Sequence, residues 1–174
     1  DAWMWERLAF TRARVICGDS ILQQRLSLFR KEVIIQGCDQ EIIFFEIGSL
    51  RKKIKKSFDP NDEFPWNIKK GLGGIFDLEL LGQGCTLLFG IESYDVKTHL
   101  SHLPKLEKWS KFDSEKMINL YGLMTRLLQV FALIGSYKDL NNLNARFTHN
   151  LILRETGIDC IENLKKELDE SRRW

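Results

Sequence analysis

The chain has 174 residues, of which 44% are hydrophobic and 29% are charged, a balance typical of an ordinary folded protein and unlike that of a disordered or fibrous one. Its formal net charge of +2 is too small to indicate nucleic-acid binding. The longest uncharged run, residues 80–91, is much shorter than the roughly 20 apolar residues that a membrane span requires, so no membrane partner is expected.

The cysteines, at positions 17, 38, 85 and 160, are isolated in hydrophobic contexts, and no C-x-x-C pair occurs. This spacing favours reduced core thiols and a cytoplasmic protein over a disulfide or zinc framework. The sequence begins without methionine, and Trp3 and Trp5 already follow a helix-like pattern. We therefore expect a fragment of a longer chain.

Apolar residues recur at helical spacing along the sequence, whereas period-two alternation is scarce, so we predict an all-α fold. The fold is expected to be a helical bundle of about seven helices that forms one domain over residues 1–174. In chain order, helices are expected over residues 2–17, 20–36, 39–57, 75–89, 96–109 (the least regular), 114–134, 144–154 and 159–171. A loop over residues 58–74 and an asparagine-rich turn over residues 141–144 interrupt them.

The predicted helix over residues 75–89 is apolar on every side, which is typical of a central, buried helix. It carries Asp77 and Glu79, and buried carboxylates need partners because an unpaired ion in a low dielectric costs several kcal/mol. Residues two apart on a helix point about 200° from each other, so these carboxylates are a poor pair for one metal ion, and no metal site is predicted. Arg12 falls within the apolar stripe of the first predicted helix and is expected to pair with Asp77 or Glu79, whereas Arg14 points the other way.

A glycine-rich turn, residues 71–74, follows Lys69 and Lys70 and enters this helix. The turn matches neither the GxxxxGK[ST] nor the GxGxxG nucleotide-binding arrangement. Exposed amides at a helix start, beside a lysine, can hold an anion. Equally, Gly73 and Gly74 can serve only to provide a positive φ or a close backbone approach. The residues by themselves leave both interpretations open.

The histidines and aromatic residues carry little functional signal. His99 and His102 are three residues apart and could share a helix face, but no third ligand lies near them in the sequence, so polar surface positions are expected. No Ser/His/Asp or Cys/His set can be assembled, and no catalytic residue is predicted. The tryptophans and phenylalanines occur at helical spacing, which indicates core positions rather than base-stacking surfaces.

Three segments resemble signatures of the bacterial glutamine synthetase adenylyltransferases. Residues 2–19, AWMWERLAFTRARVICGD, resemble W-E-x-x-A-x-x-R-A-R-x-x-x-G-D, and residues 66–83, WNIKKGLGGIFDLELLGQ, resemble F-D-L-K-x-G-x-G-G-I-x-D-I-E-F-x-x-Q. Between them, EIGSLRKKIKK over residues 46–56 is similar to E-x-x-x-M-R-x-K-M. The order and spacing agree over residues 1–83, and beyond Gly84 the likeness is one of helical character only.

The resemblance implies a polymerase-β-like nucleotidyltransferase domain followed by a helical accessory domain, which this chain would be. The opening segment is more similar to the second, C-terminal half of that bifunctional enzyme than to the first. The catalytic G-S-x-x-D-x-D motif of the upstream domain is missing, because Gly48 and Ser49 are followed by Leu-Arg-Lys. The resemblance therefore implies ATP and Mg as cofactors of the parent enzyme, none within this fragment, and a fragment that is inactive alone.

In the family, the C-terminal half transfers AMP from ATP to a tyrosine of glutamine synthetase, the N-terminal half reverses this, and glutamine and the PII protein set the balance of this nitrogen regulation. The implied partners are the upstream nucleotidyltransferase domain, glutamine synthetase and PII. Two alternatives stay open: a non-catalytic regulatory bundle that binds PII or glutamine, and part of a PII uridylyltransferase-like enzyme.

The signatures match ten residues of this sequence: Glu6, Arg12, Arg14, Lys69, Gly71, Gly73, Gly74, Asp77, Glu79 and Gln83. We predict two groups among them. The first faces the missing domain and binds nucleotide or another anion: Arg14, Lys69, Gly71, Gly73 and Gly74. The second is a structural ion-pair network: Glu6, Arg12, Asp77 and Glu79.

Overall fold

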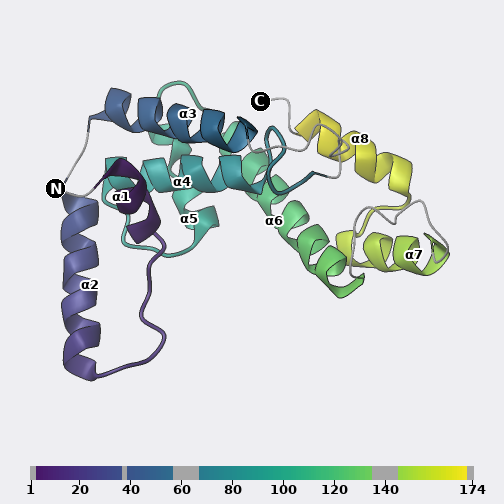
Figure 1. Cartoon of the computed structure of the whole chain (residues 1–174). Helices are drawn as coiled ribbons and strands as arrows, with labels where there is room; N and C mark the ends of the chain where they lie inside the picture. Colours follow the sequence, from purple (N-terminus) through teal and green to yellow (C-terminus); the bar gives the residue numbers. More distant parts are fainter. Residues whose placement is uncertain (1–2, 37–38, 57–66, 135–144, 172–174) are drawn as a thin grey trace. The chain divides into compact units, whose positions relative to one another are not determined.

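The computed structural model describes residues 3–36, 39–56, 67–134 and 145–171, which form eight α-helices and one short 3-10 helix (Figure 1). No strand occurs among these residues, and the predicted all-α fold is confirmed. The elements are α1 (Met4–Phe10), α2 (Ser20–Ile35), α3 (Gln40–Lys56), α4 (Ile75–Phe89), α5 (Val96–Leu100), η1 (Leu103–Lys105), α6 (Lys111–Ile134), α7 (Ala145–Thr156) and α8 (Ile161–Ser171). The predicted loop up to residue 66 and the asparagine-rich turn lie outside the described residues.

The chain divides into two compact units. The first comprises Asp1–Ser57 and Leu78–Glu115, and the second comprises Phe58–Asp77 and Lys116–Trp174. The boundaries fall inside α4 and α6, so each of these helices has residues in both units. A single domain over residues 1–174 stays a prediction.

Two glycines of α4 allow other helices of the first unit to approach it closely. A Cβ atom on Gly84 would lie 2.8 Å from the side chain of Ile47 in α3, and one on Gly82 would lie 3.2 Å from the Cβ of His99 in α5. Residues two apart on a helix face nearly opposite directions. Accordingly, α3 and α5 lie on opposite sides of α4 (Figure 1).

The core of the first unit forms around α4. Leu87 of α4 packs with Leu8 of α1 and Ile43 of α3 in a cluster that excludes nearly all solvent. Leu78 and Cys85 of the same helix are fully buried. The apolar sequence of α4 therefore fits the central position predicted for it.

In the second unit, α6 has buried residues at helical spacing, namely Met117, Leu120, Met124 and Leu127. The Lys116 side chain donates to the backbone oxygen of Glu170 in α8 at 3.4 Å. Among the described residues, α6 is long and apolar enough to cross a membrane, and 44% of its most apolar stretch is buried within the structure. The absence of a membrane partner stays a prediction.

Two predicted helices are interrupted. The segment over residues 96–109 divides into α5 and η1, and Pro104, which lacks an amide N–H, lies in the first positions of η1. The first helix was predicted to extend to residue 17 but ends at Phe10, with Thr11 as its C-cap. The hydroxyl of Thr11 donates to the carbonyl of Leu8 at 2.6 Å, a local bond that competes with helix continuation.

Arg30 of α2 explains why α1 stops. Its buried guanidinium donates to the carbonyl oxygens of Phe10 at 3.2 Å and Thr11 at 2.6 Å. In a continuing helix those two carbonyls would accept the amides of residues 14 and 15. The same guanidinium donates to the carbonyls of Glu92 at 3.0 Å and Ser93 at 2.9 Å. Arg30 therefore joins the end of α1 to the segment that follows α4.

We expect Arg30→Met to lower the free energy of unfolding by about 3 kcal/mol or more, because four hydrogen bonds from a charged group to backbone carbonyls would be lost. Urea denaturation followed by circular dichroism measures this. The neighbouring Lys31→Met is the control: its ion pair with Glu92, at 2.9 Å, joins two half-exposed side chains and should contribute about 1 kcal/mol at most. Equal losses in the two variants would contradict the role given to Arg30.

Candidate functional site

An ion pair joins the signature segment over residues 2–19 to the one over residues 66–83. In the first unit, Nη1 of Arg12 lies 2.6 Å from Oε1 of Glu79, a residue of α4. The Arg12 side chain is 41% exposed and that of Glu79 is 17% exposed. The expectation that Arg12 faces the core was wrong, because α1 ends before Arg12 and the helical stripe used to orient it does not exist. A pair this exposed contributes about 1 kcal/mol or less to stability.

Asp77 and Glu79 have different partners. In the second unit, a carboxylate oxygen of Asp77 accepts the amide N–H of Gly73 at 2.8 Å. Asp77 lies in the first turn of α4, where a negative charge interacts favourably with the helix dipole. Of the two carboxylates proposed for Arg12, the structure pairs Glu79 with it, while Asp77 closes the glycine turn.

The glycine turn is held together by its own backbone. The amide of Gly71 donates to the Asn67 carbonyl at 2.9 Å, and the amide of Gly74 donates to the Gly71 carbonyl at 2.9 Å. With the bond from Gly73 to Asp77, the amides of all three signature glycines have acceptors within the turn. Because these amides already have acceptors, an anion at the turn would bind mainly to the ammonium groups of the neighbouring lysines.

Gly73 and Gly74 meet two different backbone requirements. Gly73 has a φ of 65°, in the left-handed region that glycine adopts without strain. A Cβ on Gly74 would lie 2.8 Å from both the Gly71 and Ile68 carbonyl oxygens. The interpretation in which these glycines provide a positive φ or a close backbone approach accounts for both residues. Lys69 is then an exposed cation beside the turn. The Lys69 ammonium lies 5.6 Å from the centroid of the Phe76 ring.

The remaining predicted residues lie in the first unit. Arg14 is exposed in the non-helical segment between α1 and α2. Glu6 accepts the Trp3 amide N–H at 2.8 Å, and thereby caps the first turn of α1. Gln83 is half-buried on α4. Among the described residues, no cluster of three or more His, Cys, Asp or Glu side chains is arranged to hold a metal ion.

The burial of Arg30 and of His99 was not predicted from the sequence. Arg30 lies within the α2 stripe that buries Val33 and Ile34, a pattern that could have revealed it. His99 was expected at the surface, and that was wrong: it is fully buried beside Val96, where Gly82 leaves room for it. Local spacing did not reveal this, because the space is provided by another helix.

His99 is held by the carbonyl that also binds Arg30. Its Nε2 lies 2.9 Å from the Ser93 oxygen, which accepts from Arg30 as well. Burial lowers the pKa of His99, and the positive charges of Arg30 and Arg12 lower it further, against opposing effects of the Ser93 hydrogen bond and Asp95. The lowered pKa favours the neutral imidazole, and in that form an Nε2–H donates to the Ser93 carbonyl.

Comparisons with known proteins show which proteins this chain is similar to. No family model matches the sequence. The chain is homologous, over its whole length, to part of the bifunctional glutamine synthetase adenylyltransferase/adenylyl-removing enzymes. The predicted resemblance is thereby confirmed.

Three relatives show the extent of the similarity. The enzyme of Mannheimia succiniciproducens is 28% identical over 177 residues, which include 100% of this chain and 16% of the relative. That of Bartonella henselae is 29% identical over 178 residues, or 98% of this chain and 18% of the relative. That of Neisseria meningitidis serogroup B is 36% identical over 106 residues, or 61% of this chain and 10% of the relative. The chain spans less than a fifth of the length of these curated relatives.

We expect Gly74→Ala to destabilise the protein by about 2 kcal/mol, because the new methyl group would meet two backbone oxygens that cannot turn aside. Thermal unfolding measures this. Gly48→Ala in α3 is the matched control: no atom lies within 4 Å of its added Cβ, and alanine favours a helix by up to about 1 kcal/mol. A neutral Gly74→Ala variant would refute the close-approach interpretation.

His99 predicts a pH dependence of stability. Its pKa in the folded chain lies below the ordinary value of 6.5, so the unfolded chain binds more protons below that pH, and stability falls as the pH decreases from 6.5. In His99→Gln, whose amide can still donate to Ser93, this part of the pH dependence should vanish. Urea unfolding across this pH range tests it, and parallel pH profiles for the two proteins would contradict it.

Proposed function

We propose that this chain is the helical accessory region of a nucleotidyltransferase that adenylylates glutamine synthetase on a tyrosine with ATP and Mg, in the cytoplasm. One observation carries the proposal: the homology to bifunctional glutamine synthetase adenylyltransferase/adenylyl-removing enzymes extends over the whole chain. The likeness of the opening segment to the second half of such enzymes favours adenylylation over the removing activity. The proposed partners are an upstream nucleotidyltransferase domain, glutamine synthetase and the PII protein.

The role proposed for this chain is to support binding rather than to perform the transfer. Its Gly48-Ser49 pair lies within helix α3 and leads into Leu50, Arg51 and Lys52, which are not metal-binding carboxylates. The chemistry of ATP and Mg is accordingly assigned to the rest of the parent protein. The helical region would hold the nucleotide phosphates and present the protein substrate.

Arg14 and Lys69 are the residues proposed to contact the nucleotide. Both side chains are exposed, and each carries a charge that attracts phosphate. The contributions of Gly71, Gly73 and Gly74 are proposed to be indirect, since their amides bind within the turn that carries Lys69. The bonds of Arg12 to Glu79 and of Gly73 to Asp77 are proposed to keep these segments in place.

In the full-length enzyme, Arg14→Ala and Lys69→Ala should each raise the KM for ATP roughly tenfold, because each removes one charged contact to phosphate. The formation of adenylylated glutamine synthetase, measured by mass spectrometry at varied ATP, gives this value. Arg25→Ala and Lys97→Ala remove equally exposed cations outside the signatures and should leave the KM unchanged.

The outcome separates nucleotide binding from regulation. If Arg14→Ala and Lys69→Ala left the ATP kinetics unchanged while the enzymes stayed folded, nucleotide binding by these residues would be refuted. A changed response to PII or glutamine with normal ATP kinetics would instead favour the regulatory bundle considered from the sequence.

A further inference from the structure

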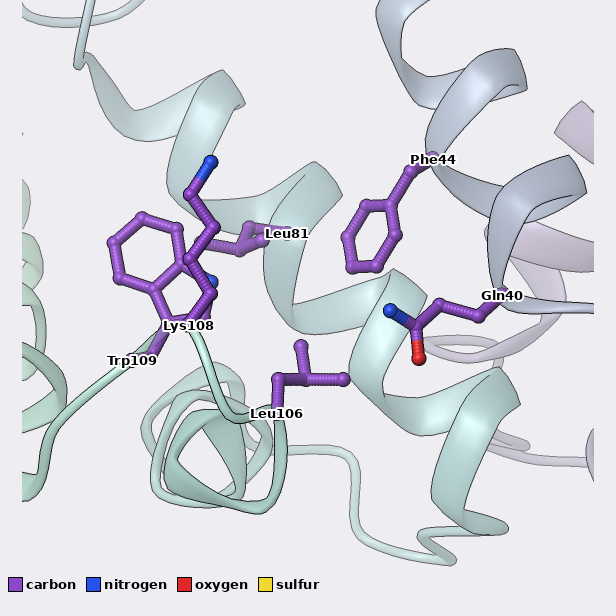
Figure 2. A pocket seen from close by; sticks show the side chains of 6 residues that line it. All are labelled: Gln40, Phe44, Leu81, Leu106, Lys108 and Trp109. Atoms are coloured by element: carbon purple, nitrogen blue, oxygen red, sulfur yellow. The ribbon is translucent and has the colours of Figure 1, made fainter.

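A pocket of about 390 Å³ lies in the first unit, and none of the ten matched signature residues is among those that line it (Figure 2). Six side chains line it, from α3, from α4 and from the segment that follows η1: Gln40, Phe44, Leu81, Leu106, Lys108 and Trp109. Its volume falls within the range of small-molecule sites, roughly 300–1,000 Å³.

The walls of the pocket are apolar and partly aromatic. Leu81 and Leu106 are more than nine-tenths buried. Phe44 points from α3 toward Leu81 of α4, and the Trp109 indole lies on the opposite side of Leu81 (Figure 2). Such walls favour an apolar body, and the two aromatic rings favour one that is itself flat and aromatic.

The pocket has one charged lining side chain, Lys108, and the Gln40 amide, which can both donate and accept hydrogen bonds. The Lys108 ammonium and the Gln40 side-chain amide belong to exposed residues, and the amide points toward the pocket (Figure 2). No carboxylate is among the six lining side chains. A ligand bound there therefore meets a positive charge and an amide donor, which match an anionic group.

We propose that this pocket binds a small aromatic carboxylate, with its ring against the apolar walls and its carboxylate toward Lys108. The apolar walls bind the ring through burial, and the donors fix its orientation. This goes beyond the proposed nucleotide contacts, because none of the six residues takes part in them.

Titration of the chain with 2-naphthoate, followed by nuclear magnetic resonance, tests the proposal. The indole N–H of Trp109 and the side-chain amide of Gln40 should shift saturably. The neutral analogue 2-naphthylmethanol should bind about fivefold more weakly, because an exposed charge pair is worth up to about 1 kcal/mol. Absence of saturable shifts at both groups, or equal binding of the two compounds, would overturn the proposal.

Substitutions then locate the charge. Lys108→Met, at an exposed position, should reduce the affinity for 2-naphthoate about fivefold and leave that for 2-naphthylmethanol unchanged. Lys97→Met is the matched control, since Lys97 is exposed but does not line the pocket, and it should bind both compounds normally. Leu106→Trp should fill the pocket and abolish both. If Lys108→Met and Lys97→Met bind 2-naphthoate equally, the proposal is wrong. This comparison does not depend on whether Leu106→Trp folds.

Discussion

The Arg30 guanidinium is the interaction on which the first unit most depends. It is buried, and its charge is stabilised by four carbonyl dipoles and by the Tyr94 ring, whose centroid lies 4.0 Å from the guanidinium carbon. By taking the carbonyls of Phe10 and Thr11, it ends α1 and releases the following residues from helical geometry. The exposure of Arg12 and Arg14 follows from this, so a buried contact determines where the signature arginines can act.

The signature over residues 66–83 and the rest of helix α4 contribute to the structure in several ways. The glycines of α4 admit α3 and α5 on opposite sides, its apolar residues complete the core, and its first carboxylate closes the turn that precedes it. Its second carboxylate, Glu79, pairs with Arg12 of the other signature. Most of the motif is thus explained by packing and backbone geometry, which leaves the exposed lysine as its clearest candidate for ligand contact.

The two proposals use different physics on different surfaces. Arg14 and Lys69 are exposed charges that attract phosphate, and neither of them lines the pocket. The pocket beside Phe44 encloses space lined by apolar groups and has a single cation. Exposed charges such as Arg14 and Lys69 suit a ligand that is held mainly by another part of a longer protein. A pocket with apolar walls and a charged lining residue suits a small molecule that is bound by this unit itself.

The sequence by itself determined the helical class, the central place of α4 and the likeness to the adenylyltransferases, since periodicity and motif order are local properties. Only the tertiary structure decided where α1 ends, which carboxylate meets Arg12 and that His99 is buried. Those outcomes depend on contacts between distant positions: Arg30 reaches back to residues 10 and 11, and Gly82 of one helix makes room for a histidine of another. Helical spacing predicts the face on which a side chain lies, but not the partner that another element brings to it.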